Sequence, residues 1–242
     1  MLATEKFAGL RRQAYSPECV SGNYSPTDSK FSGIPWLAKG EAWPTCKHCE
    51  QPMQLFLQLD LNNLPPQYAG KFGDGLLQFF YCGTSEPHCE VECESWFYND
   101  IAMLVRIVKP EGECGSPAES PVLNPFPPRT IKNWAALEPE LPRVEELVAL
   151  VDLSDEEQDA LYDSEDDESF KGPASGDKLG GYPDWVQGPE YCECPECGAP
   201  TEHLFQIDSK CNLPYMWGDL GCGHITQCAE HKHILRFGWA CS

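Results

Sequence analysis

One short string occurs twice in this chain, and the repeat constrains the fold more than any other feature. Each copy has a C-x-x-C pair, a proline three residues later, a glutamine nine residues after the second cysteine, and an aspartate two residues beyond the glutamine. The matched positions are Cys46/Cys194, Cys49/Cys197, Pro52/Pro200, Gln58/Gln206 and Asp60/Asp208. They align without a gap, so we interpret the chain as an internal duplication.

The match continues after a slip of one residue. Asn63-Leu-Pro65 corresponds to Asn212-Leu-Pro214, and Gly73-Asp74 corresponds to Gly218-Asp219. Each copy then has a cysteine directly after a strand-like run, Cys82 in the first and Cys228 in the second. Each copy therefore supplies three sulfurs, and a tetrahedral metal site needs one ligand more.

Zinc suits these ligands, because thiolate and imidazole match its borderline-soft character and a C-x-x-C turn places two sulfurs on one face of a tetrahedron. For site one we expect Cys46, Cys49, Cys82 and Cys89, with Cys93 as the alternative fourth ligand. For site two we expect Cys194, Cys197, Cys228 and His231, with Cys192, Cys222, His224 and His233 as alternatives. The competing interpretation is that metal has been lost and the cysteines are small buried apolar residues.

The periodicity of apolar residues predicts a fold that is α+β and largely β. Residues 53–60 alternate between apolar and other side chains, which predicts a strand with one buried face. Further strands are expected at 76–81, 101–108, 203–208, 224–227 and 234–241. Helices are expected at 5–15, 144–151 and 154–162, the last opened by a capping box formed by Ser154 and Glu157.

Composition along the chain predicts three parts. Residues 1–108 hold an N-terminal lead-in and repeat one, and residues 16–29 within them are expected to be a loop. Residues 109–180 form a proline-rich and acidic connector with short helices, and residues 181–242 hold repeat two. In each repeat a zinc-ribbon-like C-x-x-C site is expected to clamp β-structure.

The chain has 242 residues, of which 41% are hydrophobic, and this is enough for a real core. No apolar run approaches the roughly 18 residues of a spanning helix. The first fifteen residues lack the apolar centre of a signal peptide, so a cytoplasmic location without membrane contact is expected. In that setting the 14 cysteines favour metal binding over a disulfide framework.

The formal net charge of -21 argues against direct nucleic-acid binding and favours a basic protein partner. Ten acidic residues and no basic one lie between Asp152 and Glu168. This run has two interpretations: a solvated helix face leading into a flexible linker, or an attractive surface for a basic partner.

Catalytic motifs are absent from the sequence. There is no H-E-x-x-H, no G-x-S-x-G and no glycine loop that would cradle phosphate. Asp60 and Asp208 are expected to cap backbone amides rather than to act as paired acid and base. A non-enzymatic protein is therefore expected.

Several stretches resemble the YwqG-like family of domains of unknown function: Ser29-Lys-Phe-Ser-Gly-Ile-Pro35, Trp43-Pro44, Phe56-Leu-Gln-Leu-Asp60, Gly75-Leu-Leu-Gln-Phe-Phe80 and Met216-Trp-Gly-Asp219. The C-x-x-C, proline, glutamine and late-cysteine pattern is also similar to the programmed-cell-death-protein-two and Tsr4 proteins, which are dedicated chaperones of a ribosomal protein of the small subunit.

The resemblance implies a duplicated α+β fold and protein binding without catalysis. For bacterial members it implies an immunity role against polymorphic toxins. We therefore expect a toxin-neutralising immunity protein that sequesters a basic toxin domain. The alternatives are a chaperone of a basic ribosomal protein and a metal-dependent hydrolase that uses site two.

Overall fold

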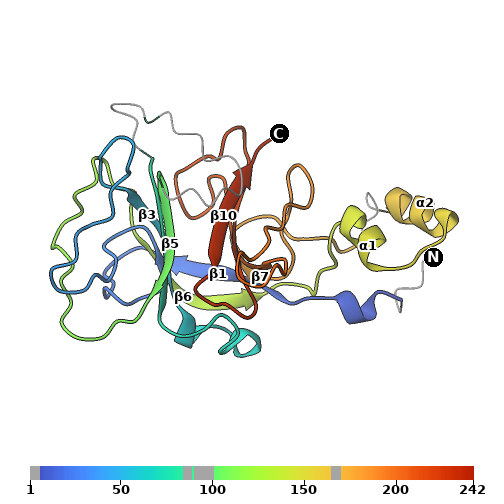
Figure 1. The fold of residues 1–242 in the computed structure, drawn as a ribbon, viewed down its shortest axis with the longest axis horizontal. Coiled ribbons are helices and arrows are strands. Elements are labelled where there is room, and N and C mark those ends of the chain that lie inside the picture. The colour runs from blue at the N-terminus through green and yellow to red at the C-terminus, as the bar shows by residue number, and fades with distance from the viewer. Residues whose placement is uncertain (1–5, 84–88, 90–100, 165–169) are drawn as a thin grey trace.

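The computed structural model of the protein describes residues 6–83, 89, 101–164 and 170–242 (Figure 1). Its strands are β1 (Ala14–Val20), β2 (Lys30–Phe31), β3 (Gln54–Asp60), β4 (Leu76–Tyr81), β5 (Met103–Val108), β6 (Arg129–Ala136), β7 (Lys178–Gly180), β8 (Glu202–Asp208), β9 (Cys222–Gln227) and β10 (Leu235–Ala240). Its α-helices are α1 (Val144–Leu150) and α2 (Asp155–Ser164), and short 3-10 turns lie at Ala8–Leu10, Leu61–Asn63 and Pro66–Tyr68.

The strands of the described residues form one antiparallel sheet in the order β10-β9-β8-β7-β1-β6-β2-β3-β4-β5. The sheet curls until its two end strands, β5 and β10, approach each other (Figure 1). Aromatic side chains fill the space enclosed by this curl. Phe79 of β4 lies 4.2 Å from Phe237 of β10 between ring centroids, and the indole N–H of Trp239 donates to the Tyr81 hydroxyl at 3.2 Å.

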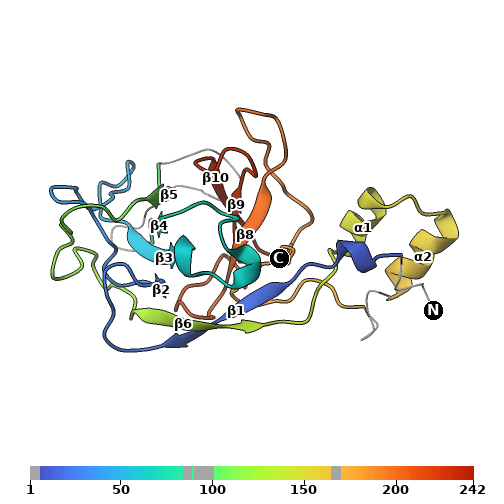
Figure 2. The same ribbon diagram turned by 90° about the horizontal axis from the view of Figure 1, so that it is seen from below.

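β1 and β6 occupy the two central places in the strand order and run side by side (Figure 2). β1 pairs with β6 and β7, although β7 lies more than 150 residues later in the chain. β6 pairs with β1 and β2. Strand β1, from the N-terminal part of the chain, has both of its partners after residue 108. Strand β6, from the later part, has both of its partners before that residue, so the two parts of the chain are interlocked in one sheet.

The strands that carry the repeated string are buried on both faces. All residues of β4 and β9 are buried, and β3 and β8 are buried except at their ends. The expectation of one buried face for residues 53–60 is wrong. One face of the sheet meets the aromatic interior, and the other is covered by the connecting loops. Successive side chains of β3 therefore point alternately into the aromatic interior and toward the loops, and both sides are buried.

The repeated glutamines explain part of that second environment. Gln58 accepts the backbone N–H of Trp36 and donates to the carbonyls of Pro26 and Asp28. Gln206 accepts the backbone N–H of Asp184 and donates to loop carbonyls in the same way, at Ala174 and Gly176. Each buried amide thus holds two loops against the sheet. It supplies hydrogen bonds to backbone N–H and C=O groups that would otherwise be buried without a partner.

Two lysines are fully buried beside these glutamines. Lys30 of β2 is paired in register with Gln58, and Lys178 of β7 is paired with Gln206. The Lys178 ammonium contacts the buried carboxylate of Glu140 at 3.0 Å. The Lys30 ammonium instead donates to three backbone carbonyls between residues 25 and 28. Burial lowers the pKa of Lys30 to about 7.

The helices form a small outlying layer at one end of the molecule (Figure 1). Leu147 of α1 and Leu161 of α2 belong to an apolar cluster separate from the sheet interior. The capping box is confirmed, because the Ser154 N–H donates to Glu157 at 2.8 Å and the Glu157 N–H donates to the Ser154 hydroxyl at 3.3 Å. The expected helix at 5–15 is wrong. A 3-10 turn and the start of β1 occupy the described part of that range.

The strands expected from the sequence are present with shifts of one or two residues at their ends. β1, β2, β6 and β7 were not expected. The loop expected at 16–29 is wrong at residues 16–20, which belong to β1. β6 and β7 lie inside 109–180, so part of the stretch interpreted as a connector belongs to the sheet. These four strands owe their conformation to pairing with distant partners, which local periodicity does not report.

Candidate metal centres

The first C-x-x-C pair lies in a tight turn just before β3. The Cys46 N–H donates to the Gln51 carbonyl, and the Glu50 N–H donates to the Cys46 carbonyl, both at 2.9 Å. A β-bridge between Thr45 and Pro52 closes the base of the turn. Glu50 has a left-handed φ of 59°, which turns the chain back toward β3.

The second pair repeats this turn before β8. The Cys194 N–H donates to the Ala199 carbonyl and the Gly198 N–H donates to the Cys194 carbonyl, both at 2.8 Å. Here glycine occupies the left-handed position, with φ 72° at Gly198. Proline at position 200 again bridges to the residue before the first cysteine. The two turns therefore present their sulfurs in the same way.

Cluster one consists of Cys46, Cys49, Cys82 and Cys89. The four sulfurs lie within 4.8 Å of one another, with Cys46 to Cys89 at 3.9 Å and Cys49 to Cys82 at 3.6 Å. Cys82 is placed by β4, which pairs with β3, so the sheet itself brings the late cysteine back to the turn.

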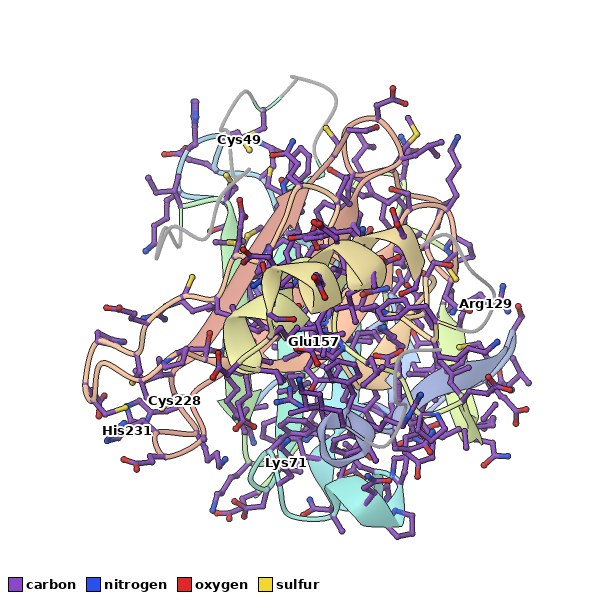
Figure 3. All side chains as sticks on the ribbon, turned by 90° about the vertical axis from the view of Figure 1, so that its right-hand side faces the viewer. Cys49, Lys71, Arg129, Glu157, Cys228 and His231 are labelled. Carbon is purple, nitrogen blue, oxygen red and sulfur yellow. The ribbon has the colours of Figure 1, made fainter. Side chains whose placement is uncertain are left out.

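Cluster two consists of Cys194, Cys197, Cys228 and His231. The sulfurs of Cys197 and Cys228 are 3.7 Å apart, and the Nδ1 atom of His231 lies 3.6 Å from Cys194 and 3.7 Å from Cys228. Cys228 follows β9 directly, and His231 lies in the turn that leads into β10. Figure 3 shows this cluster and Cys49 of cluster one at separate places on the molecule.

These spacings fit a tetrahedral zinc ion. With Zn–S bonds of about 2.3 Å and Zn–N bonds of about 2.0 Å, tetrahedral angles separate two sulfurs by about 3.8 Å and a sulfur from a nitrogen by about 3.5 Å. The five separations given above, 3.6–3.9 Å, lie close to these values. A disulfide would need sulfurs about 2.05 Å apart, and these cysteines are free thiols.

At Cys228 the local electrostatics favour the anionic sulfur that a metal requires, whereas the pKa of Cys197 is raised to about 11, in part by the neighbouring sulfurs of Cys194 and Cys228. The backbone N–H of His231 donates to the Cys228 sulfur at 3.3 Å and lowers the pKa of Cys228 to about 6. The contacts of the His231 Nδ1 atom with the sulfurs of Cys228 and, second, Cys194 raise the pKa of His231. A backbone donor of this kind binds a sulfur lone pair that the metal does not use, and it thereby orients the thiolate.

The alternative ligands lie elsewhere. Cys93 lies outside the described residues. Cys222 and His224 belong to β9 and are buried in the sheet, where the Cys222 thiol donates to the Ile207 carbonyl. Cys192 stands apart from both clusters, and burial raises its pKa to about 11. His233 contacts Glu196 rather than the sulfurs.

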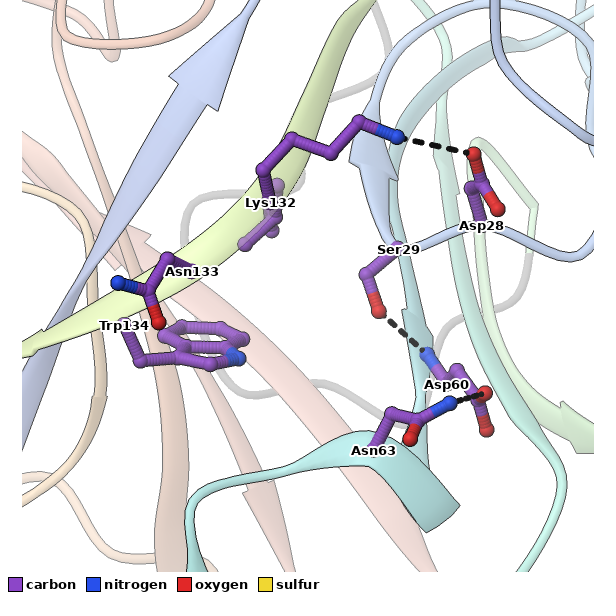
Figure 4. A pocket seen from close by; sticks show the side chains of 8 residues that line it. Asp28, Ser29, Asp60, Asn63, Lys132, Asn133 and Trp134 are labelled. Carbon is purple, nitrogen blue, oxygen red and sulfur yellow. Dashed lines mark hydrogen bonds and ion pairs between the residues drawn. The ribbon is translucent and has the colours of Figure 1, made fainter.

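A polar pocket of about 350 Å³ lies between β2, β3 and β6 (Figure 4). Asp28 and Asp60 face it together with the indole of Trp134, an arrangement that can take a cationic group. Both carboxylates are already engaged, however. Asp28 contacts the Lys132 ammonium at 3.6 Å, and Asp60 accepts from Asn62 and Asn63. As expected from the sequence, Asp60 caps backbone amides.

Sequence reasoning did not single out Glu196, which lies inside the second C-x-x-C turn. Its carboxylate approaches both His231 and His233. The signal that points to it is the combination of an acidic residue between two ligand cysteines with a histidine as fourth ligand.

These features define an antiparallel, largely β protein with two four-residue clusters able to hold a metal ion. The family model of DUF1963, a domain of unknown function, matches residues 29–231. The chain therefore belongs to the DUF1963 family. No curated protein matches it. In the described residues, no helix combines the length and the apolar character needed to cross a membrane.

Proposed function

We propose that this protein is a non-enzymatic binding protein, stabilised by two structural zinc ions, whose acidic surface captures a basic protein partner. The observation that supports the two zinc ions is the spacing of the donor atoms, which is 3.6–3.9 Å in five pairs and within 4.8 Å throughout each cluster. Four ligands fill all positions of a tetrahedron, so a water activated by the metal would have to displace one of them. This supports a structural role over hydrolysis at site two.

We further propose that the two sites belong to an internal duplication of a zinc-ribbon-like unit. The turns at Cys46 and Cys194 share their hydrogen bonds, and both late cysteines follow the strand that pairs with the one after the turn. Gln58 and Gln206 bind matching loops. A lysine stands opposite each glutamine. Equivalent contacts at equivalent positions are what a duplicated unit would retain.

The binding part of the proposal is supported by the net charge of -21 and by the acidic surface of α2. A field of one sign accelerates the encounter with a basic protein and disfavours nucleic acid. A toxin domain neutralised in the cytoplasm is the leading partner. A nascent basic ribosomal protein is the alternative, since the same charge would shield its tails until assembly.

The zinc proposal is tested by metal analysis of protein purified without chelator. We expect about two zinc ions per chain and a large loss of thermal stability when a chelator removes them. Cys49→Ser and Cys197→Ser should each remove one ion. Cys114→Ser is the matched control, because Cys114 is exposed and lies outside both clusters. Zinc-free protein that melts at the same temperature with and without chelator would refute the proposal.

The partner proposal is tested by capture from the native cell on immobilised full-length protein. A basic partner should be retained at about 50 mM salt and weakened as the Debye length shortens. A variant with amides at four acidic positions of α2 (Asp155, Glu156, Asp159 and Asp163) is the control. Absence of any basic protein at low salt would contradict the proposal. A toxin among the captured proteins would favour immunity, and ribosome-subunit imbalance on gene deletion would favour the chaperone.

A further inference from the structure

The carboxylate of Glu196 lies between two histidines at the edge of cluster two. Its Oε2 atom is 3.4 Å from the Nε2 atom of His231, and its Oε1 atom is 2.6 Å from the Nε2 atom of His233. The backbone positions of all three are set by the cluster itself. Glu196 belongs to the C-x-x-C turn, and the histidines belong to the turn between β9 and β10.

His231 uses its two ring nitrogens for different contacts. Nδ1 faces the sulfurs of Cys194 and Cys228, whereas Nε2 faces Glu196. An imidazole that binds a metal through Nδ1 carries its proton on Nε2. A carboxylate that accepts this proton orients the ring, selects the tautomer and makes the metal-binding nitrogen more basic.

Cluster one provides an internal comparison. Its fourth donor is the thiolate of Cys89, which has no ring to orient and no second proton to place. The position that matches Glu196 in the first C-x-x-C turn is His48. The glutamate therefore occurs in the turn of cluster two, which contains His231, and is absent from the turn of cluster one, which has four cysteines. This distribution is what a role of Glu196 toward His231 requires.

We propose that Glu196 is the positioning residue of metal site two: it accepts the Nε2 proton of His231 and is itself held in place by His233. The inference rests on the proposed zinc site, and it assigns to Glu196 a role that cluster one does without. Outer-shell carboxylates of this kind change metal affinity by about 10–100-fold. Since Glu196 is 42% exposed, we expect the lower end of that range, about tenfold.

The test is a competition titration of the zinc-loaded full-length protein with a chromogenic chelator. Glu196→Gln should release the zinc of site two at about one tenth of the chelator concentration needed for wild type, and site one should be unchanged. His233→Ala should show a smaller shift in the same direction. Glu230→Gln is the matched control, because it removes the same charge next to cluster two, and the exposed Glu230 side chain makes no hydrogen bond or ion pair with another described residue.

A second measurement separates orientation of His231 from a general loosening of the turn. Long-range ¹H–¹⁵N spectra should show a protected Nε2 proton on a metal-bound His231 in wild type, and rapid exchange of that proton in Glu196→Gln. Equal zinc retention and an equally protected proton in Glu196→Gln and Glu230→Gln would overturn the inference. Wild-type protein without zinc in site two would instead refute the proposed zinc site.

Discussion

At the residue scale, the most informative side chains are polar groups buried beside the sheet. Gln58 and Gln206 have no exposed surface, yet every bond they make is to a backbone group or to another buried amide. Such residues determine which loop lies against which strand. Their recurrence in the sequence therefore reflects a structural requirement.

Replacing either glutamine by leucine should destabilise the protein by about 3 kcal/mol, because a buried backbone N–H loses its side-chain acceptor and two loop carbonyls lose a buried donor. Urea unfolding of Gln58→Leu and Gln206→Leu measures the loss. Gln67→Leu, at an exposed position, should change the free energy of unfolding by less than about 0.5 kcal/mol. Glutamine variants as stable as that control would contradict the assigned role.

The buried Lys30 predicts a specific dependence of stability on pH. Burial lowers its pKa from 10.5 to about 7 in the folded protein, and the unfolded chain keeps the ordinary value. Between these values the unfolded chain binds more protons, so raising the pH from 7 to 10 stabilises the fold, by at most about 1.4 kcal/mol per pH unit.

Lys30→Met removes this dependence, and the difference between wild type and variant isolates it from the titration of the thiols. We expect wild type to gain stability relative to Lys30→Met across that range in urea unfolding at several pH values. Parallel pH profiles of the two proteins would show that Lys30 titrates as an exposed lysine does.

At the element scale, the outlying helices and the sheet are stabilised by separate apolar clusters. The sequence located α1 and α2 well, because a capping box and helical periodicity are local signals. It failed at 5–15, where a 3-10 turn at Ala8–Leu10 is followed by a β-bridge between Arg12 and Glu140 and by the start of β1, whose partners are distant in the sequence.

Ser154→Ala should weaken α2 by about 1 kcal/mol, since one side of the capping box is lost. Hydrogen exchange should accelerate at residues 157–164, whereas β3 and β8 keep their protection and zinc content stays the same. Ser120→Ala, outside the helices, serves as control. Loss of protection throughout the sheet would contradict the independence of the two clusters.

At the scale of the whole molecule, the central strands tie the two parts of the chain together. Both partners of β6 lie in residues 1–108, and both partners of β1 lie in 109–242. Neither part can complete the sheet alone. The expected division into two repeats and a connector describes the pattern of the sequence. In space, strands from all three parts belong to one sheet.

Fragments 1–108 and 109–242 should be unstable when expressed separately and should form a one-to-one complex when expressed together. The reason is that separation leaves β1 and β6 without any of their partners. Co-purification and circular dichroism of the two fragments measure this. A fragment that folds cooperatively on its own, with full stability, would contradict the interlocked arrangement.

The sequence alone determined the parts of this protein that depend on short spacing. Two C-x-x-C turns, the late cysteine of each repeat and the strands between them follow from local pattern, because a strand and its hairpin partner return the chain to the turn. Tertiary structure alone decided which of several nearby residues completes each cluster. It also decided how β1 and β6 join the halves and that Glu196 faces His231, since these depend on the path of loops and on pairing between distant segments.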